Sequence, residues 1–511
     1  MPFLRFAQDD IAQWSKGMGI RFSRDGLTIF LILLACYAYF LPRWADWNQN
    51  SRFDLVRAIV EKGTLAIDDY AANTGDYATV GGHIYSDKAP GLSFAAVPIY
   101  STVNRLMHIP GVDDIIQRLA GSPAFAETLN PEGSGLLRDK VHAALGLTVV
   151  TFFLVMLPSA LLGVLLYAFL GHLGFSRPVR VTTPLIYGLA TIAFPYSGAF
   201  YAHQFTAVLL FGAFYLAFLM RQRRLGSGMM PVVGFLLTYS VISEYPTALI
   251  AGAIGIYALA SVPDRRWTLG AVLAGLPPLL MLGLYNAAIF GTPFKLGYEY
   301  STLWAETHKV GFLSLSLPTL EALWGITFSS YRGLYFLSPI LLLTWPGLLY
   351  FWKAREWRAE SILCGWAVVS FMLFNASSVM WPGGYSIGPR YLVPMLPFAA
   401  VALGFGLTVA LRRRGSYALV LILTLWSWGL VWIETISGQA FPDYTPEPLI
   451  NYSVPRFIAG DIARNLGMAL GLRSWASLLP LVGIVVILMW RLLNLRQRLS
   501  RTKAIVAQKC A

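Results

Sequence analysis

The residues best suited to chemistry lie in one polar stretch of the chain, between residues 44 and 91. Acidic, basic and aromatic side chains alternate there, in place of the Lys and Glu residues that fill ordinary solvated loops. A carboxylate in such a stretch can act as a general base, and an Arg or Lys can bind an anion. The stretch therefore predicts a functional site with these candidate members: Asp46, Gln49, Arg52, Asp54, His83, Tyr85, Asp87 and Lys88.

Polar residues also interrupt the apolar sequence at distant positions. Ionisable groups at the ends of apolar runs are costly unless they pair or line a wet cavity, so we expect a common cavity. Arg390 follows a Gly-Pro pair at the start of an apolar run, which makes a good anion site by charge and by helix dipole. The distant candidates for this cavity are His203, Glu244, Arg332, Tyr385 and Arg390.

The composition explains why the apolar runs belong in a membrane. Of the 511 residues, 56% are hydrophobic and only 13% are charged, about half the ~25% usual for soluble domains. The net charge of +13 does not indicate nucleic-acid binding, because Arg and Lys cluster in short blocks between apolar runs, as at 221–224 and 412–414. That placement is the positive-inside pattern of a membrane protein.

The apolar runs that must position the polar residues are twelve in number. A spanning helix needs about 20 apolar residues, and two of the runs, on either side of Glu244, are short. We expect spans near residues 27–43, 141–171, 182–201, 205–220, 230–243, 247–261, 268–290, 334–352, 361–380, 391–411, 417–436 and 475–493.

Charge gives these spans a direction. If the N-terminus, with Arg5, Lys16, Arg21 and Arg24, is cytoplasmic, every second connection and the C-terminal tail are basic, as the positive-inside rule requires. The first loop, residues 44–140, then faces the other side of the membrane.

Two segments of the first loop are expected to be helices at the membrane surface. The apolar segment 89–107 cannot be a span, because counting it would invert every later loop against the charge rule. Near residue 55, apolar side chains form a stripe, with Arg52, Asp54 and Arg57 largely on other faces, as in an amphipathic interfacial helix.

The predicted architecture is an all-α polytopic membrane protein with about twelve transmembrane helices. Residues 1–493 are expected to form one transmembrane domain, and residues 494–511 a basic cytoplasmic tail. The cysteines Cys36, Cys364 and Cys510 lie far apart, so neither a disulfide framework nor a metal motif is visible.

A first helix followed by a long outward loop with an Arg-aromatic motif and a later Lys-Pro motif resembles the GT-C superfamily of membrane glycosyltransferases. The similarity is greatest to the branch of protein O-mannosyltransferases and aminoarabinose transferases, family 39. The stretch 49–53, Gln-Asn-Ser-Arg-Phe, matches the branch's Asp-Glu-x-Arg-Tyr, and 87–90, Asp-Lys-Ala-Pro, matches its Glu-Lys-Pro-Pro. The topology covers nearly the whole chain and the motifs about fifteen residues.

The resemblance implies transfer of a sugar from a polyprenyl-phosphate carrier to an acceptor hydroxyl, with inversion, on the periplasmic or extracellular side of a bacterial inner membrane. Arg52 and Lys88 match positions that bind the lipid phosphate. The donor is expected to be a lipid-linked sugar, the acceptor a glycan, a lipid or a protein, and membrane lipids the surroundings. No metal ligand is assigned, although a divalent metal ion could assist the leaving phosphate.

One departure from the family bears directly on the chemistry. Gln49 stands where the branch has the Asp expected to be the general base, and an amide cannot accept a proton at useful pH. Either Asp46, Asp54 or Asp87 takes that role, or the chain is a divergent or inactive relative.

Two other classes of function remain open at this point. A transporter or flippase of lipid-linked sugars would need paired halves with broken helices, and the sequence has no such halves. A catalytically degenerate GT-C-fold assembly protein is the other alternative, because fold likeness alone does not establish activity.

Overall fold

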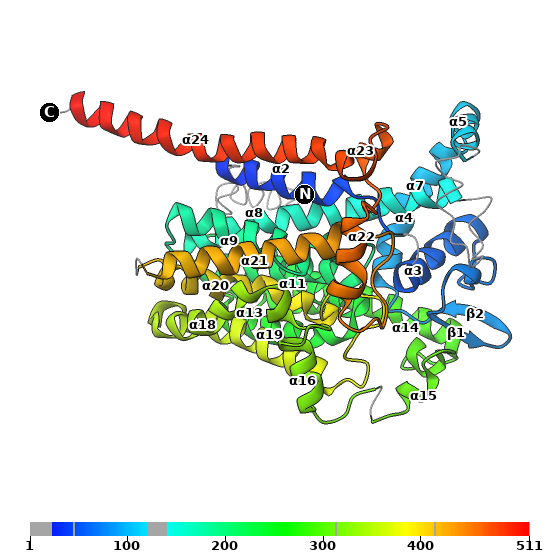
Figure 1. Ribbon diagram of the computed structural model, residues 1–511. Helices are drawn as coiled ribbons and strands as arrows, with labels where there is room; N and C mark the ends of the chain where they lie inside the picture. Colours follow the sequence, from blue (N-terminus) through cyan, green and yellow to red (C-terminus); the bar gives the residue numbers. More distant parts are fainter. Residues whose placement is uncertain (1–22, 44–45, 121–139, 312–313, 413–414, 510–511) are drawn as a thin grey trace.

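The computed structural model describes residues 23–43, 46–120, 140–311, 314–412 and 415–509. Arg5, Lys16, Arg21, Arg413 and Arg414, which the topology prediction used, lie outside the described residues. Long helices run side by side through the molecule (Figure 1). The principal ones are α2 (Arg24–Tyr39), α7 (Lys140–Thr151), α8 (Leu157–His172), α9 (Arg177–Leu189), α11 (Ala202–Arg221), α12 (Met230–Ser243), α13 (Ala248–Ser261), α14 (Trp267–Phe290), α18 (Thr344–Lys353), α19 (Arg358–Ser377), α20 (Leu396–Ala410), α21 (Ser416–Ile436) and α24 (Leu479–Lys509).

Each of the twelve predicted runs contains helix, but not every run is one unbroken helix. Within the described residues, seven helices are long and apolar enough to cross a membrane, and α12 and α13 form shorter apolar helices. The run 334–352 is divided into α17 (Leu334–Leu337), a helical turn and α18. The division falls at Ser338-Pro339, because proline lacks an N–H and disfavours helix at the residue before it.

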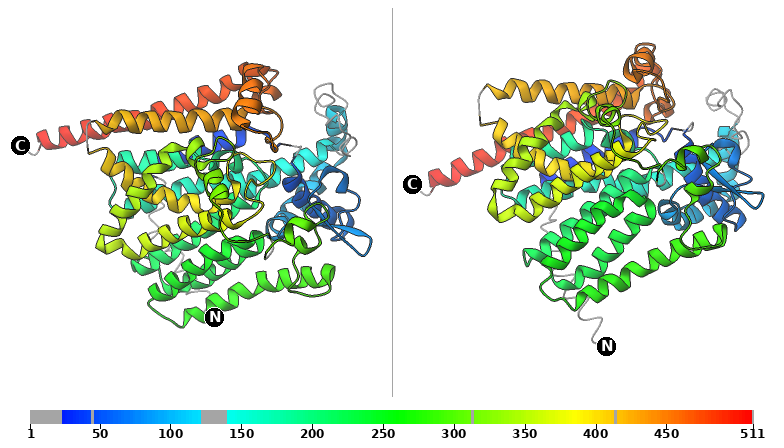
Figure 2. Two further views of the ribbon diagram at one scale, coloured as in Figure 1. Left: turned by 60° about the horizontal axis from the view of Figure 1, so that its bottom comes forward. Right: turned by 90° about the horizontal axis from the view of Figure 1, so that it is seen from below.

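The helices differ in how much of their surface is covered by protein. The span in α11 and the span Arg390–Ala410 are 83% buried, whereas those in α14 and Ser474–Asn494 are 11% and 17% buried. The views in Figure 2 place α14 at one edge of the bundle and α21 and α24 at the opposite edge. A helix that is apolar all round and yet exposed fits contact with lipid, so these are the outer helices of a membrane bundle.

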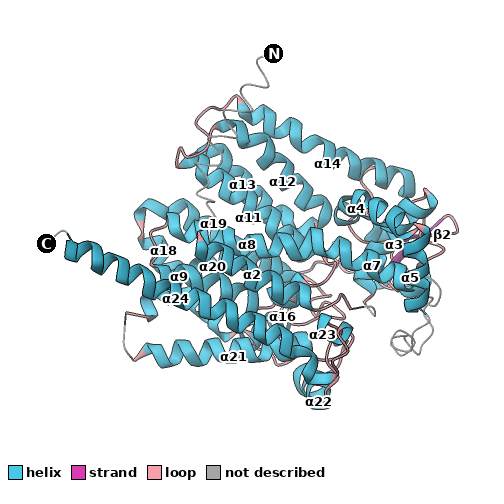
Figure 3. Cartoon of the chain, turned by 90° about the horizontal axis from the view of Figure 1, so that it is seen from above, coloured by secondary structure: helices cyan, strands magenta, loops and turns pink. Residues whose placement is uncertain are grey.

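The first loop and other connections fold together at one end of the bundle (Figures 1 and 3). The hairpin strands pair antiparallel from Tyr77↔Ser86 to Val80↔His83, and the turn residues Gly81 and Gly82 both have positive φ, as tight hairpin turns require. The elements of this end are α3 (Trp47–Arg57), β1 (Tyr77–Val80), β2 (His83–Ser86), α4 (Gly91–Met107), α5 (Pro110–Ala120), α15 (Ala305–His308), α22 (Val454–Ile458) and α23 (Leu466–Ala469).

Helix α3 differs from the expected surface helix, because every residue from Asn48 to Arg57 is buried. Its charges find partners that periodicity cannot reveal. Arg52 pairs with Glu244, 192 positions later in the chain, and Arg57 pairs with Glu61, whose carboxylate also accepts hydrogen bonds from Tyr70 and Tyr100. Paired in this way, charges that would otherwise need solvent can be enclosed.

The prediction of an all-α polytopic membrane fold with a large first loop is confirmed, with the β1–β2 hairpin as an addition. Short helices complete the described chain: α10 (Ala193–Ser197) follows α9, and α16 (Leu320–Thr327) precedes α17. Helix α24 continues through residues 494–509, which the sequence analysis separated as a tail.

Candidate active site

A cavity of about 620 Å³ lies among the helix ends and connections where the first loop folds. Its walls come from α3, residue 76, the segment after β2, the start of α11, the turn between α12 and α13, residues 298–308, residues 314–315, the end of α19, residues 382–391 and residue 444. Helix ends expose side chains that the middle of a packed bundle would hide. The charged side chains of the lining are Asp46, Arg52, Asp76, Lys88, Glu244 and Arg390.

The structure brings together about half of the residues that the sequence analysis selected, and their roles remain predictions. Those that line the cavity are Asp46, Arg52, Lys88, His203, Glu244, Tyr385 and Arg390. Those outside its lining are Gln49, Asp54, His83, Tyr85, Asp87 and Arg332.

Glu244 is placed by the break between α12 and α13. Its backbone is extended, with φ −155° and ψ 103°, and Pro246 begins the next helical turn, a position where the missing N–H costs nothing. The Glu244 Oε2 atom lies 3.4 Å from Arg52 Nη2 and 3.5 Å from His203 Nδ1. Burial raises the pKa of Glu244, and the charges of Arg52, Arg390 and Lys88 partly offset that effect.

Lys88 is held between two carboxylates. Its Nζ lies 2.9 Å from Asp76 Oδ2 and 3.1 Å from Asp87 Oδ1. Burial opposes the charged form of Lys88, but the two carboxylates outweigh it and raise the pKa of the ammonium group. Asp87 is itself fixed by a hydrogen bond from Ser301 Oγ at 3.0 Å. Lys88 is therefore a fixed, permanently charged group at the cavity wall.

Arg390 is the cation without an ion-pair partner among the described residues of the lining. It is 7% exposed, its Nη1 donates to the hydroxyl of Tyr201 at 3.4 Å, and its Nε has no hydrogen-bond partner. The rings of Tyr201 and Tyr391 lie 5.4 and 5.3 Å from the guanidinium carbon. A buried cation that faces a cavity without a carboxylate is suited to bind an anion.

Asp46 joins Arg390 to helix α3 through Tyr201. The Tyr201 hydroxyl donates to Asp46 Oδ2 at 2.5 Å, while Asp46 Oδ1 accepts the backbone N–H groups of Asn48 and Gln49 as the N-cap of α3. Burial raises the pKa of Asp46 to about 6, despite the hydrogen bond from Tyr201 and the charge of Arg390.

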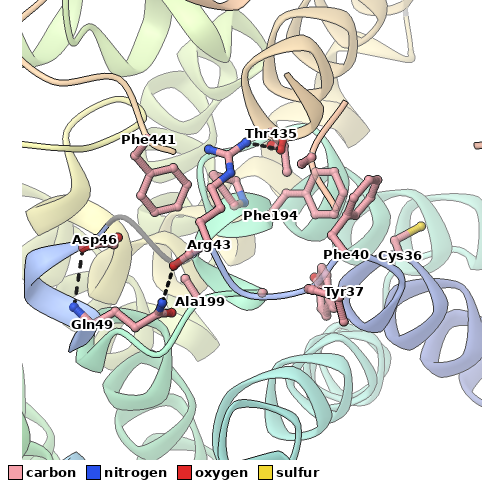
Figure 4. Close-up of a pocket in the computed structure, with 14 residues that line it drawn as sticks. Cys36, Tyr37, Phe40, Arg43, Asp46, Gln49, Phe194, Ala199, Thr435 and Phe441 are labelled. Atoms are coloured by element: carbon pink, nitrogen blue, oxygen red, sulfur yellow. Dashed lines mark hydrogen bonds between the residues drawn. The ribbon is translucent and has the colours of Figure 1, made fainter. Parts of the chain in front are cut away.

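Gln49 makes hydrogen bonds to the backbone (Figure 4) and does not line the 620 Å³ cavity. Its Nε2 donates to the Arg43 carbonyl at 2.6 Å, and its Oε1 accepts the N–H of Phe200 at 2.8 Å. It lines a small pocket of about 30 Å³ that also touches Asp46 and Phe441. Both ends of the amide are satisfied, so this position ties the first loop to the start of α11.

Three other candidates from the first loop make contacts away from the cavity. Asp54 is buried, with Oδ1 accepting a hydrogen bond from Asn73 at 3.0 Å, and burial raises its pKa to about 8. His83 is exposed on the hairpin and its Nδ1 lies 2.8 Å from Asp68 Oδ2. Tyr85 packs in the apolar cluster beneath the hairpin.

Arg332 is fully buried, and all its donors serve backbone carbonyls. Its guanidinium donates to Ser386 at 2.7 Å, Gly384 at 3.0 Å and Asp443 at 2.5 Å, and makes longer bonds to Pro382 and Pro442. These bonds hold the segment 382–386 that forms part of the cavity wall. Arg332 thus shapes the wall without lining it.

The cavity also contains residues that the site prediction did not include. Asp76 forms an ion pair with Lys88 and accepts a hydrogen bond from Trp304 Nε1 at 3.2 Å. His308 lies with its ring 5.2 Å from that of Tyr298. A lone Asp in a Gly-Asp-Tyr sequence and aromatic residues in a membrane protein give no specific signal, so the structure alone finds them. The additional polar and aromatic lining residues include Trp47, Asp76, Tyr298, Trp304, His308, Tyr391 and Tyr444.

Comparison with known proteins assigns no family to the chain. No family model matches the chain, and no curated protein is similar to it. Among solved structures, the chain is similar to ArnT from Cupriavidus metallidurans, determined bound to undecaprenyl phosphate. The two are 15% identical and superpose with a TM-score of 0.41, over 91% of this chain and 74% of that one. A similarity of this degree assigns neither activity nor ligand.

Proposed function

We propose that this integral membrane protein is a glycosyltransferase of the GT-C type that moves a sugar from a polyprenyl-phosphate carrier to an acceptor hydroxyl. The reaction takes place in the 620 Å³ cavity, on the extracytoplasmic side of a bacterial inner membrane. The donor is a lipid-linked sugar, and the acceptor is a glycan, a lipid or a protein. This proposal is supported by Arg52 and Lys88, the residues of the first-loop motifs that line the cavity.

The observation that carries the proposal is the meeting in one cavity of three cations, of which Arg52 and Arg390 are buried and Lys88 has a side chain only 10% exposed. Arg52, Lys88 and Arg390 come from α3, from the segment after β2 and from the start of the α20 span, and each lines the cavity. When the sugar leaves its carrier, negative charge develops on the lipid phosphate, and fixed cations stabilise that charge in the transition state. Arg390, which has no ion-pair partner in the described lining, is the best placed to bind the phosphate.

The cavity also supplies what the acceptor needs. Attack on the anomeric carbon requires a group that removes the proton of the acceptor hydroxyl, and the lining contains Asp46, Asp76 and Glu244. Among the described residues no group of three or more His, Cys, Asp or Glu side chains is placed to hold a metal ion. We assign stabilisation of the leaving phosphate's charge to the three cations.

Sugar transfer from labelled donors tests the proposal. Purified wild type in detergent is incubated with a panel of radiolabelled polyprenyl-phosphate sugars and membrane extract as acceptor. We expect transfer of label by the wild type and its loss in Lys88→Ala, with the matched variant Lys62→Ala active. Lys62 belongs to the same loop, where it forms an exposed pair with Asp69.

The result against the proposal is equally direct. Absence of transfer from every donor, while the purified protein still binds polyprenyl phosphate, favours a carrier of the lipid or a degenerate relative. Transfer that survives in Lys88→Ala separates the activity from the cavity.

A further inference from the structure

The carboxylates of the cavity differ in whether their oxygens are already occupied. Asp46 uses Oδ1 to cap α3 and Oδ2 to accept the Tyr201 hydroxyl. Asp76 uses Oδ1 to accept from Trp304 Nε1 and Oδ2 to pair with Lys88. A carboxylate oxygen has two lone pairs, so an oxygen that already holds a protein donor has at most one left for the proton of a substrate.

Glu244 is arranged differently. Arg52 and His203 both lie at Oε2, at 3.4 and 3.5 Å. No hydrogen bond from a described residue reaches Oε1, and the side chain lines the cavity. One oxygen is thus fixed by a guanidinium and the other is left for a ligand.

We propose that Glu244 is the proton acceptor of the transfer reaction and that Arg52 and His203 position it. This assignment rests on the proposed glycosyltransferase function. It gives the reaction a base although Gln49 occupies the position where the resembling family has its acid. Arg52 and Gln49 both lie on α3, but the cavity lining contains Arg52 and excludes Gln49.

The step balances with groups that the cavity holds. Glu244 Oε1 takes the proton of the acceptor hydroxyl as the hydroxyl oxygen forms a bond to the anomeric carbon. The bond from the anomeric carbon to the phosphate oxygen breaks, and its electron pair leaves with the polyprenyl phosphate. Lys88 and Arg390 stabilise the negative charge that this phosphate gains. The proton then passes from Glu244 to water.

Arg52 is fixed well enough to act as a positioning residue. Its Nη1 donates to the Ala89 carbonyl at 2.8 Å, its Nε donates to Asn48 Oδ1 at 3.2 Å, and its Nη2 faces Glu244. The residue is 1% exposed. A guanidinium whose fork is fixed on three sides sets the direction of the carboxylate it holds.

His203 completes the arrangement from the first turn of α11. The side chain is buried, and neither ring nitrogen has a hydrogen-bond partner among the described residues. A small rotation of the imidazole brings Nδ1 within hydrogen-bond distance of Glu244 Oε2, a tightening that catalytic contacts undergo when substrate binds. The titratable and charged groups around Glu244 are Arg52, Lys88, His203, Tyr245, Tyr298 and Arg390.

The pH dependence of transfer distinguishes a base from a structural ion pair. Activity that needs ionised Glu244 falls as the pH drops below the pKa of that carboxyl, which gives wild type an acidic limb in its kcat profile. For Glu244→Gln we expect kcat to fall about 100- to 10,000-fold, KM for the donor to stay within a few fold, and the acidic limb to vanish. For Glu244→Asp we expect a lower rate that keeps the acidic limb.

Removal of one charge from a buried pair can also unfold the protein, so a second variant is needed. Arg52→Gln combined with Glu244→Gln removes both charges, leaves no uncompensated charge, and is expected to be folded, to bind polyprenyl phosphate and to transfer no sugar. Glu360→Gln, at an Arg–Glu pair outside the cavity in which the carboxylate is buried and Arg221 is one-third exposed, is the control and is expected to keep the acidic limb.

The outcomes separate this inference from the function on which it rests. If Glu244→Gln transfers sugar at the wild-type rate and keeps the acidic limb, the role of Glu244 is overturned. Loss of that limb in Asp46→Asn instead assigns the base to Asp46. A wild type that transfers no sugar from any donor overturns the glycosyltransferase function, and the base with it.

Discussion

The two ends of the helix bundle use the same residue types in different ways. At the end opposite the cavity, which we call the basic end, the contacts between charges are short: Arg177 donates twice to Asp25, at 2.6 and 2.7 Å. Glu360 Oε1 accepts from Arg221 at 2.5 Å and from Tyr257 at 2.6 Å, while Glu360 Oε2 is buried without a partner among the described residues. At the cavity end, the contact between Arg52 and Glu244 is longer, at 3.4 Å. The difference teaches that a short contact enclosed by protein holds helices together, whereas a long contact at a cavity wall leaves a charged group accessible to a ligand.

The physical reason lies in the cost of enclosing charge. A buried ion pair repays the loss of water only when its geometry is good and its remaining hydrogen bonds are made. The Arg177–Asp25 pair meets that condition, because both carboxylate oxygens accept a hydrogen bond. The longer Arg52–Glu244 contact at the cavity end is a weaker pairing, and proteins retain such arrangements mainly at functional sites.

The largest effect that this comparison predicts is at Arg390. Replacement by Gln removes the cation that has no carboxylate partner in the described lining, so the leaving phosphate loses charge stabilisation. We expect kcat/KM for label transfer to fall about 100- to 1,000-fold, the range for loss of one preorganised donor. Arg456→Gln, at an exposed pair with Asp461, serves as the control. A similar loss in both variants would contradict the contrast.

At the basic end, the expected change is in stability and not in activity. Glu360→Gln leaves Arg221 without its partner carboxylate, and breaking a buried pair costs about 3–5 kcal/mol, reduced here because Arg221 is one-third exposed. Thermal unfolding in detergent measures the loss as a lower Tm. Folded Glu360→Gln is expected to transfer sugar at the wild-type rate, and a specific loss of kcat would make this end part of the site.

A third change, at Gln49, tests whether a residue next to the cavity supports its structure or takes part in its chemistry. Gln49→Glu keeps the side-chain shape but replaces the amide that donates to the Arg43 carbonyl, so two oxygens face each other unless the carboxyl is protonated. We expect a loss of about 1–3 kcal/mol in unfolding free energy and no gain in transfer rate. Burial raises the folded-state pKa of such a carboxyl, so the variant is more stable at pH 5 than at pH 8. A faster enzyme would instead make residue 49 the base.

The smallest effect concerns Asp54, which is buried in α3 and does not line the cavity. Burial raises the pKa of Asp54 in the folded state to about 8, from the ordinary value of 3.8 for an exposed Asp carboxyl. Because the folded state binds the extra proton between those values, wild-type stability declines as pH rises from about 4 to 8, by at most about 1.4 kcal/mol per pH unit. Asp54→Asn is expected to lack this decline and to transfer sugar normally. Chemical denaturation at pH 5 and pH 8 measures it, with exposed Asp69→Asn as the control.

The helical architecture could be predicted from the sequence because apolar length is a local signal. The break at Pro339 was not predicted, although proline marks it, because the apolar run continues on both sides. The burial of α3 was not predictable, since the partner of Arg52 lies 192 positions away and its own periodicity resembles that of a surface helix. Local patterns fix helices, whereas pairing across the chain decides which of them are enclosed.

The candidate site was predictable only as a group of polar residues on one side. Arg332 and Arg390 both occur at the start of apolar runs and look alike in sequence. In the structure, one guanidinium serves the carbonyls of Gly384 and Ser386 while the other faces the cavity. Which arginine is engaged by backbone depends on how distant loops approach, and no local pattern records that.

The separation of Arg52 and Glu244 along the chain also has a consequence for biosynthesis. At about 5–20 residues per second, the ribosome needs roughly 10 to 40 s to add the 192 positions between them. During that interval the guanidinium of the nascent first loop has no native counter-ion, so α3 cannot yet be enclosed. The loop must wait, hydrated or held by an insertion factor, until the α12–α13 pair enters the membrane, and the cavity closes only late in the assembly of the chain.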